Sequence, residues 1–231
     1  MSRSQQTIPV ITIDGPTGSG KGTVSRLVAE RLGWHLLDSG AIYRVFALAS
    51  LEKHIAVDDE HGLAKLAGKL DIEFVPGPTG DSLVLLAGHD VTEAIRQEKV
   101  GSQASKVSQY REVRQALLEC QRSFQRFPGL VADGRDMGTI IFPDAELKIF
   151  LSATAEERAK RRYHQLTSKG ITADYNEILS DLLERDHRDQ TRPVAPLKPA
   201  KDAELIDNTD ISIEQAVQKV INLAHQHHLV G

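Results

Sequence analysis

Cysteine and long apolar runs are scarce in this sequence. Its 231 residues include one cysteine, Cys120, so an internal disulfide framework is excluded and a cysteine-based metal site is disfavoured. No apolar run approaches the roughly 20 residues that cross a bilayer. Residues 1–7 are polar and lack the apolar segment of a secretory signal. We therefore expect a cytoplasmic protein that does not enter a membrane.

An excess of positive charge is also lacking. Lys and Arg number 28 against 32 Asp and Glu, which gives a formal net charge of −4 and a pI of about 6.1. Aromatic residues, which stack on nucleic-acid bases, make up only 5%. The remaining composition, 40% hydrophobic and 26% charged, is ordinary for one or two globular domains. We expect no nucleic-acid partner.

The strongest motif in the chain is the glycine-rich run GPTGSGKGT at 15–23. It lies between an apolar segment, 10–13, and a helical pattern, 23–32. A strand, a glycine-rich turn, a lysine and a helix form a phosphate cradle, because the backbone N–H groups and the helix dipole point at one anion. Lys21 adds a mobile charge for the β- and γ-phosphates. The residues predicted to bind a nucleoside triphosphate are Gly15, Pro16, Thr17, Gly18, Ser19, Gly20, Lys21, Gly22 and Thr23.

This run departs from the common form of the motif, in which Ser or Thr follows the lysine. Here Gly22 takes that position and Thr23 comes one residue later. The variant is typical of small-molecule kinases of the nucleotide type. We expect Thr23 to contribute to a Mg²⁺ site, together with an acidic residue at a strand end. Asp133 suits that role, and Asp38 could compete for it.

Short apolar runs alternate with helical patterns along most of the chain. This alternation predicts a parallel sheet covered by helices on both faces, with ligands at the carboxyl ends of its strands. The five runs lie at 10–13, 35–37, 130–132, 147–151 and 204–206.

One segment, 71–91, has a different pattern. Two apolar stretches, 71–75 and 82–86, flank a loop at 76–81, and 87–90 reads as a further turn. This predicts a small antiparallel sheet inserted between helices at 58–70 and 98–107. Further helical patterns cover 103–127, 155–168 and 175–189.

Arginines gather where phosphate chemistry would need them, because their planar forks bind phosphate through two hydrogen bonds. Arg44 and Arg135 follow predicted strand ends, and Arg158, Arg161 and Arg162 share one helix face. Arg185, Arg188 and Arg192 follow, interleaved with Asp186 and Asp189. The competing interpretation is a solvated basic face for residues 158–162 and a ladder of surface ion pairs for residues 185–189.

Together these motifs resemble the bacterial cytidylate kinases from about residue 9 to residue 224. The segments that carry the resemblance are 15–23, 34–44, 132–139, 142–145 and 192–197. The DSGAIYR run at 38–44 and the DGRDMGT run at 133–139 differ from those of adenylate kinases.

The resemblance implies a single P-loop kinase unit, 1–231, acting as a monomer. Its core would comprise 8–57, 128–154 and 200–226, its nucleoside-monophosphate insert 58–110, and its helical lid 155–192. ATP and Mg²⁺ would convert CMP or dCMP into CDP or dCDP, as in pyrimidine nucleotide metabolism.

Residue roles also follow from the resemblance. Ser39, Arg44, Arg135 and Arg192 would surround the CMP phosphate, Ser105, Arg114 and Asp136 would read cytosine, and Arg185 and Asp189 would hold the sugar. The catalytic residues would be Lys21, Arg135, Arg158 and Arg192, while Arg161 and Arg162 would cover ATP.

Three other functions are compatible with parts of the sequence. A P-loop kinase could use another acceptor, such as UMP, AMP or an alcohol. An alcohol would need a base near the nucleophile, and Asp38 or Asp133 could serve. A nucleotide-controlled binding protein would also need the cradle, although the chain lacks a guanine-reading NKxD run. Binding of nucleic acid through the arginine clusters conflicts with the acidic balance.

Overall fold

The computed structural model describes residues 7–76 and 82–230. The chain divides into two compact units. The core unit contains the described residues up to Asp38 and from Arg122 onward, and the insert unit contains Ser39–Gln121. The insert expected at 58–110 lies within the insert unit, and residues 77–81 of its expected loop lie outside the described residues.

The core unit is built on a five-stranded sheet of order β2-β6-β1-β7-β8. All four strand pairs are parallel, so the predicted five-stranded parallel sheet is confirmed. The strands are β1 (Val10–Asp14), β2 (His35–Asp38), β6 (Leu130–Gly134), β7 (Leu147–Ser152) and β8 (Glu204–Asp207). All residues of the central strand β1 and of its neighbour β6 are buried, which explains why these strands read as continuous apolar runs.

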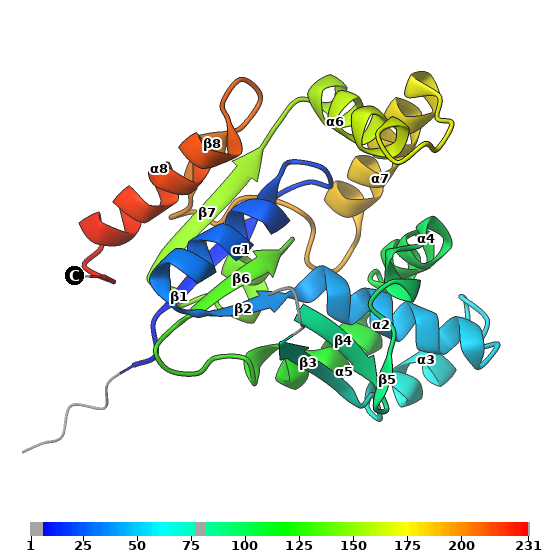
Figure 1. Ribbon diagram of the computed structural model, residues 1–231. Coiled ribbons are helices and arrows are strands. Elements are labelled where there is room, and N and C mark those ends of the chain that lie inside the picture. The colour runs from blue at the N-terminus through cyan, green and yellow to red at the C-terminus, as the bar shows by residue number, and fades with distance from the viewer. Residues whose placement is uncertain (1–6, 77–81, 231) are drawn as a thin grey trace, which may run out of the picture. The chain divides into compact units, whose positions relative to one another are not determined.

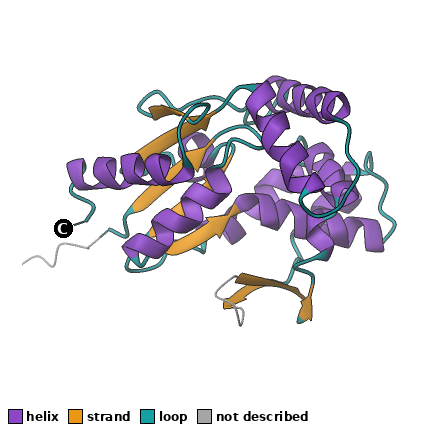
Figure 2. Ribbon diagram, turned by 45° about the horizontal axis from the view of Figure 1, so that its top comes forward, coloured by secondary structure: helices purple, strands orange, loops and turns teal. Residues whose placement is uncertain are grey.

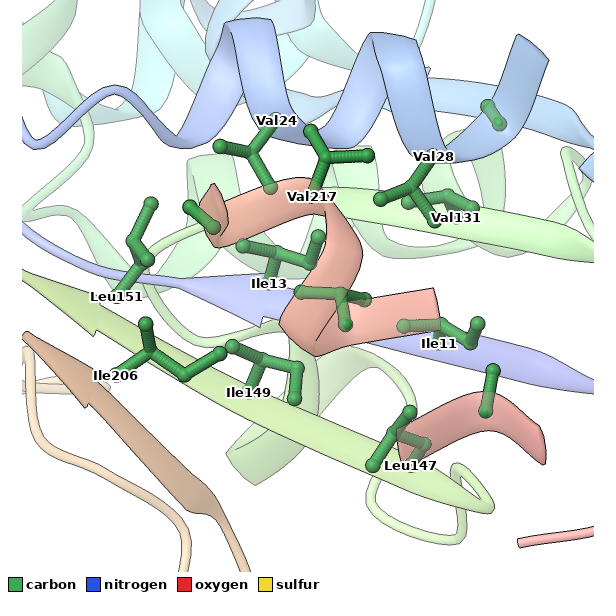
Figure 3. Close-up of a cluster of buried hydrophobic side chains, with 14 residues drawn as sticks. Ile11, Ile13, Val24, Val28, Val131, Leu147, Ile149, Leu151, Ile206 and Val217 are labelled. Atoms are coloured by element: carbon green, nitrogen blue, oxygen red, sulfur yellow. The ribbon is translucent and has the colours of Figure 1, made fainter. Parts of the chain in front are cut away.

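Two helices cover one face of this sheet, α1 (Lys21–Leu32) and α8 (Ile213–Gln226) (Figure 1). Their apolar side chains pack on alternate strand residues, as Figure 3 shows for Val24 and Val217 above Ile13. Side chains alternate between the two faces of a strand. Thr12 and Asp14 therefore belong to the opposite face, which contacts the short π-helical turn η2 (Met137–Ile141).

The expected lid forms two helices in the core unit, α6 (Ala155–Thr167) and α7 (Tyr175–Thr191), which pack against each other. Each begins with a side chain that accepts a backbone N–H of its first turn, Thr154 for α6 and Asp174 for α7. Within the described residues, no helix has the length and apolar character needed to cross a membrane.

The insert unit combines helices with the predicted antiparallel sheet. Its strands β3 (Ile72–Pro76), β4 (Ser82–Leu86) and β5 (His89–Asp90) lie in that order (orange in Figure 2). Val84 and Val91 pack with Val45 in a small core. The helical elements are α2 (Ser39–Glu52), α3 (Glu60–Ala67), the 3₁₀ turn η1 (Ala94–Arg96), α4 (Glu98–Val107) and α5 (Arg111–Arg122).

Two local expectations in this region were wrong. Residues 87–90 are not only a turn, since His89 and Asp90 pair with β4 as a third strand. The helix expected over 103–127 is interrupted at 108–110 and ends at Arg122. At the interruption the Ser108 hydroxyl donates to the Ser105 carbonyl oxygen at 2.9 Å, a local bond of the kind that competes with helix continuation.

Candidate active site

The glycine-rich loop after β1 presents an open helix N-terminus. A side chain at Gly15 would place its Cβ 2.1 Å from the Leu151 carbonyl oxygen, so only glycine fits this close approach. Gly20 has φ +91° and precedes α1 without any side-chain cap, and the first turn of α1 holds no acidic residue. By contrast, α6, α7 and α8 all start with side-chain caps. The first N–H groups of α1 therefore suit an anion.

Lys21 lies at the start of α1 and is almost completely buried. Its Nζ donates to the Pro16 carbonyl oxygen at 3.1 Å, which folds the side chain back along the loop. Burial lowers the pKa of Lys21 to about 8, with the positive charge of Arg135 acting in the same direction and the Asp133 carboxylate against it. A bound phosphate would supply the negative charge that this ammonium needs.

A cavity of about 500 Å³ opens beside the loop, entirely within the core unit. Its volume falls in the range of small-molecule sites. Three arginines line one part of it, and Ile211 and Ile213 give it an apolar wall. The full lining is Gly18, Gly20, Thr23, Arg158, Arg161, Arg162, Gln165, Ile211, Ser212 and Ile213. The wall at 211–213 was not anticipated from the sequence, although it follows the last strand, β8.

Arg158 is the most constrained of the three. Its guanidinium forms a two-point ion pair with Asp186, at 2.5 and 3.2 Å, and donates to the Thr17 carbonyl oxygen at 2.9 Å. Both side chains are mostly buried, with 4% and 13% of their surface exposed. Arg158 thus ties the lid helices to the phosphate loop, and Asp186 is a partner that sequence reasoning missed.

The other two arginines are oriented by neighbours on α6 and after β8. Arg161 pairs with Glu157 at 3.0 Å and donates to the Asn208 carbonyl oxygen at 2.6 Å. Arg162 donates to Gln165 at 2.9 Å. Asn208, another residue not anticipated, is buried and donates through Nδ2 to the Ser19 carbonyl oxygen at 2.7 Å. Asn208 therefore supports the loop from the side of β8.

A second group of expected residues lies in the core unit, where the segment that follows β6 contacts the end of α7. Arg135 pairs with Asp189 at 3.0 Å and donates to Thr17 Oγ1 at 2.6 Å. Arg192 reaches Asp136 at 3.4 Å, with both side chains buried. Burial by itself raises the pKa of Asp189, but the charges of Arg135 and Arg185 outweigh it and hold that pKa below its ordinary value. The structure thus brings together the five acceptor-binding residues expected in the core unit, which are Arg135, Asp136, Arg185, Asp189 and Arg192.

The insert unit carries four expected residues on three helices. Ser39 on α2 donates to Gln121 Oε1 on α5 at 2.7 Å. Arg44 on α2 donates to the Ile95 carbonyl oxygen at 2.9 Å. Arg114 on α5 donates to the Ser108 carbonyl oxygen at 3.1 Å, and its guanidinium carbon lies 5.7 Å from the centre of the Tyr43 ring. Gln121 and Tyr43 were not anticipated from the sequence.

Ser105 on α4 differs from the other residues of this group. Its hydroxyl is buried, and no hydrogen-bond partner for it is found within the described residues. A buried polar group without a partner is costly, so a ligand that bonds to this hydroxyl would remove that cost. The same reasoning applies in the core unit to the buried Ser19 hydroxyl of the loop.

Three residues were expected at or near a Mg²⁺ site, namely Thr23, Asp133 and Asp38. Asp133 is buried with Oδ1 unpartnered in the described part of the chain, and a Cβ on Gly22 would lie 3.2 Å from its Oδ2. Burial raises the pKa of Asp133 to about 7, against the opposing charge of Lys21. Asp38 is its register partner on β2, and Thr23 lines the cavity. The described residues hold no cluster of three or more His, Cys, Asp or Glu that could bind a metal without other ligands.

A parallel sheet with a phosphate loop after its central strand, an open helix N-terminus and converging arginines defines the core unit as a P-loop kinase. The cytidylate kinase family profile matches residues 11–226. The chain belongs to the cytidylate kinase family, and the resemblance noted in its sequence is confirmed.

Individual relatives agree over almost the whole chain. It is 55% identical to a cytidylate kinase of Colwellia psychrerythraea, over 96% of this chain and 98% of the relative. It is 53% identical to a cytidylate kinase of Klebsiella pneumoniae, over 95% of this chain and 96% of the relative. It is 52% identical to a cytidylate kinase of Proteus mirabilis, over 94% of this chain and 96% of the relative.

Proposed function

We propose that this chain transfers the γ-phosphoryl group of ATP to CMP or dCMP and releases ADP with CDP or dCDP. The observation that carries the proposal is the family match over residues 11–226, because it spans both units and every residue expected at the site. The geometry of the core unit supports it independently, through the open N-terminus of α1 and the buried Lys21 beside it.

In this proposal the donor triphosphate lies on the glycine-rich loop. The N–H groups of α1 and the ammonium of Lys21 bind its phosphates. Arg158, Arg161 and Arg162 face the same cavity and offset the charge that spreads over the transferring group. Ile211 and Ile213 provide an apolar surface suited to the flat face of a base.

Mg²⁺ would accompany ATP. The unpartnered Oδ1 of Asp133 and the Thr23 hydroxyl that lines the cavity are oxygen donors of the kind Mg²⁺ prefers, partly through water. When bound, the metal neutralises phosphate charge and orients the phosphoryl group.

The acceptor would be bound by residues that are already oriented. Arg135 and Arg192, together with Ser39 and Arg44, are proposed to bind the acceptor phosphate, while Arg185 and Asp189 hold the sugar. In the core unit these arginines include two paired with carboxylates, Arg135 with Asp189 and Arg192 with Asp136. Such pairing reduces the entropy lost when phosphate binds.

Cytosine would be read by complementary hydrogen bonds. Its exocyclic amine donates, which suits the Asp136 carboxylate, while its N3 and O2 accept, which suits the Arg114 guanidinium and the Ser105 hydroxyl. Uracil presents a carbonyl and an N–H at two of these positions, so its binding would leave buried groups unpaired. A mismatch of this kind discriminates strongly between substrates.

The reaction needs no dedicated base. A phosphate oxygen of CMP is already anionic and acts as the nucleophile, so the protein's work is positioning and charge stabilisation. Exclusion of water from the donor phosphates would limit hydrolysis of ATP.

A coupled assay of ADP release tests the proposal. ATP and Mg²⁺ are supplied with CMP, dCMP, UMP, AMP or GMP, each in a separate reaction. We expect fast release with CMP and dCMP and slow release with the other three. Equal rates with AMP or GMP, or no stimulation by any monophosphate, would contradict the assignment.

A further inference from the structure

Asp14, the last residue of β1, contacts the segment that carries Arg135 and Asp136. Its Oδ1 accepts the backbone N–H of Met137 and its Oδ2 accepts that of Gly138, both at 2.8 Å. The side chain is buried, with 4% of its surface exposed. Neither the glycine-rich loop motif nor the proposed reaction gives this carboxylate a role.

These two bonds cap the first turn of η2 from a distant part of the chain. Met137 is the first residue of η2, and Asp136 occupies the position before it. An aspartate in that position ordinarily accepts the first N–H groups of its own helix. The Asp136 side chain does not do so; it lies 3.4 Å from Arg192 instead. Asp14 therefore performs the capping that would otherwise occupy Asp136.

Close packing holds the same segment against the sheet. A Cβ on Gly138 would lie 2.8 Å from Thr12 Oγ1 and 3.3 Å from the Lys148 side chain, so η2 lies directly on this face of β1 and β7. Burying a carboxylate here is expensive, because burial raises the pKa of Asp14 to about 7 even with two backbone N–H groups bound to it. An apolar side chain would avoid this cost but would leave the N–H groups of Met137 and Gly138 without their acceptor.

We propose that Asp14 is a positioning residue for the acceptor base. By capping η2 it keeps the Asp136 carboxylate directed toward Arg192 and the acceptor. The inference rests on the proposed function, since it assigns base selection to Asp136.

The test compares Asp14→Asn with Asp144→Asn. Asparagine keeps the size of Asp14 but offers one acceptor oxygen and turns an N–H₂ group toward a backbone N–H. Asp144 is exposed in the same unit and lies outside η2, and its replacement removes one carboxylate charge. Steady-state constants for CMP, UMP and ATP are measured at the same pH for the wild type and both variants.

We expect Asp14→Asn to lower the CMP-over-UMP ratio of kcat/KM by about ten-fold or more. The KM for CMP rises while the KM for ATP changes little, and Asp144→Asn behaves as wild type. An equal loss for CMP and UMP would overturn the proposal, because a merely structural role weakens both alike. Failure of the proposed function shows separately, as a wild-type enzyme without preference for CMP.

A second measurement does not depend on the folding of the variant. In wild-type protein the amide protons of Met137 and Gly138 are followed by nuclear magnetic resonance and hydrogen exchange. Bonds to a carboxylate predict downfield resonances and slow exchange for both. Fast exchange of either amide in the folded protein would show that Asp14 does not cap η2, and the proposal would then fail.

Discussion

The core unit places part of its functional side chains at strand ends, whereas the insert unit places all of its expected ones on helices. In the core unit the phosphate loop follows β1, and Asp133, Arg135 and Asp136 lie at or just beyond the end of β6. In the insert unit Ser39, Arg44, Ser105 and Arg114 all lie on helices. Parallel strands bring their carboxyl ends to one edge whatever their side chains are, whereas a helix presents a residue according to how it packs.

We infer from this difference that changes in the two units should affect different steps of the reaction. The core unit holds the loop, Lys21 and the arginines proposed to bind the donor phosphates, so changes to these groups should reduce turnover with every acceptor. The insert unit holds groups whose positions depend on packing, such as Arg114 beside the Tyr43 ring. Changes there should alter the affinity and identity of the acceptor and leave the donor unaffected.

The largest expected effect is that of Lys21→Met. Loss of the ammonium removes a preorganised charge from the donor phosphates, and we expect kcat to fall by about 10³-fold with CMP and dCMP alike. Steady-state kinetics measure the fall, and circular dichroism checks the fold. Lys219→Ala, which removes an exposed charge on α8, is the control. An active Lys21→Met enzyme would remove Lys21 from the mechanism.

Arg158→Ala should have the next largest effect. It leaves the Asp186 carboxylate without its two-point partner and breaks the bond to the Thr17 carbonyl oxygen. We expect kcat to fall by about 10²-fold and the free energy of unfolding to fall by about 3 kcal/mol. Denaturant unfolding and kinetics measure both, with exposed Lys160→Ala on α6 as the control. A normal kcat with lowered stability would restrict Arg158 to a structural role.

The pH dependence gives a third expectation. The pKa of Lys21 is lowered to about 8 from 10.5, so its charge is lost as pH rises through 8. Above this value kcat/KM for ATP should fall by about tenfold per pH unit. The unfolded chain binds more protons than the folded one between the two values, so stability attributable to Lys21 should rise with pH over that window.

Lys21→Met is the reference for both pH profiles. It should lack the alkaline fall in kcat/KM and the matching rise in stability. If the variant and the wild type share the same alkaline limb, another group is responsible for it.

Ser105→Ala should have the smallest effect, confined to the acceptor. The hydroxyl is buried and unpartnered within the described residues, so its removal should not lower the melting temperature. Loss of one hydrogen bond to cytosine should raise the KM for CMP by about 2- to 10-fold. The KM for ATP should not change, and exposed Ser102→Ala on the same helix should match wild type. A lowered kcat with every acceptor would break the contrast between the units.

Much of the fold was predictable because its signals are local. The five apolar runs became the five parallel strands, and the glycine-rich run became the loop before α1. The errors also had local causes. The interruption of the helical pattern at 108–110 depends on a serine hydroxyl bonding to a carbonyl of the preceding turn, which the apolar periodicity does not reveal.

The sequence by itself determined the class of chemistry, because a phosphate cradle needs only closely spaced glycines, a lysine and a helix start in one short segment. Only the tertiary structure revealed the additional polar residues that contact the expected site residues. Asp14 meets an amide 123 residues away, and Asp186, Asn208 and Gln121 contact site residues that no spacing rule connects to them. A buried polar group can be satisfied by any correctly placed partner, and only the packed chain determines which residue that partner is.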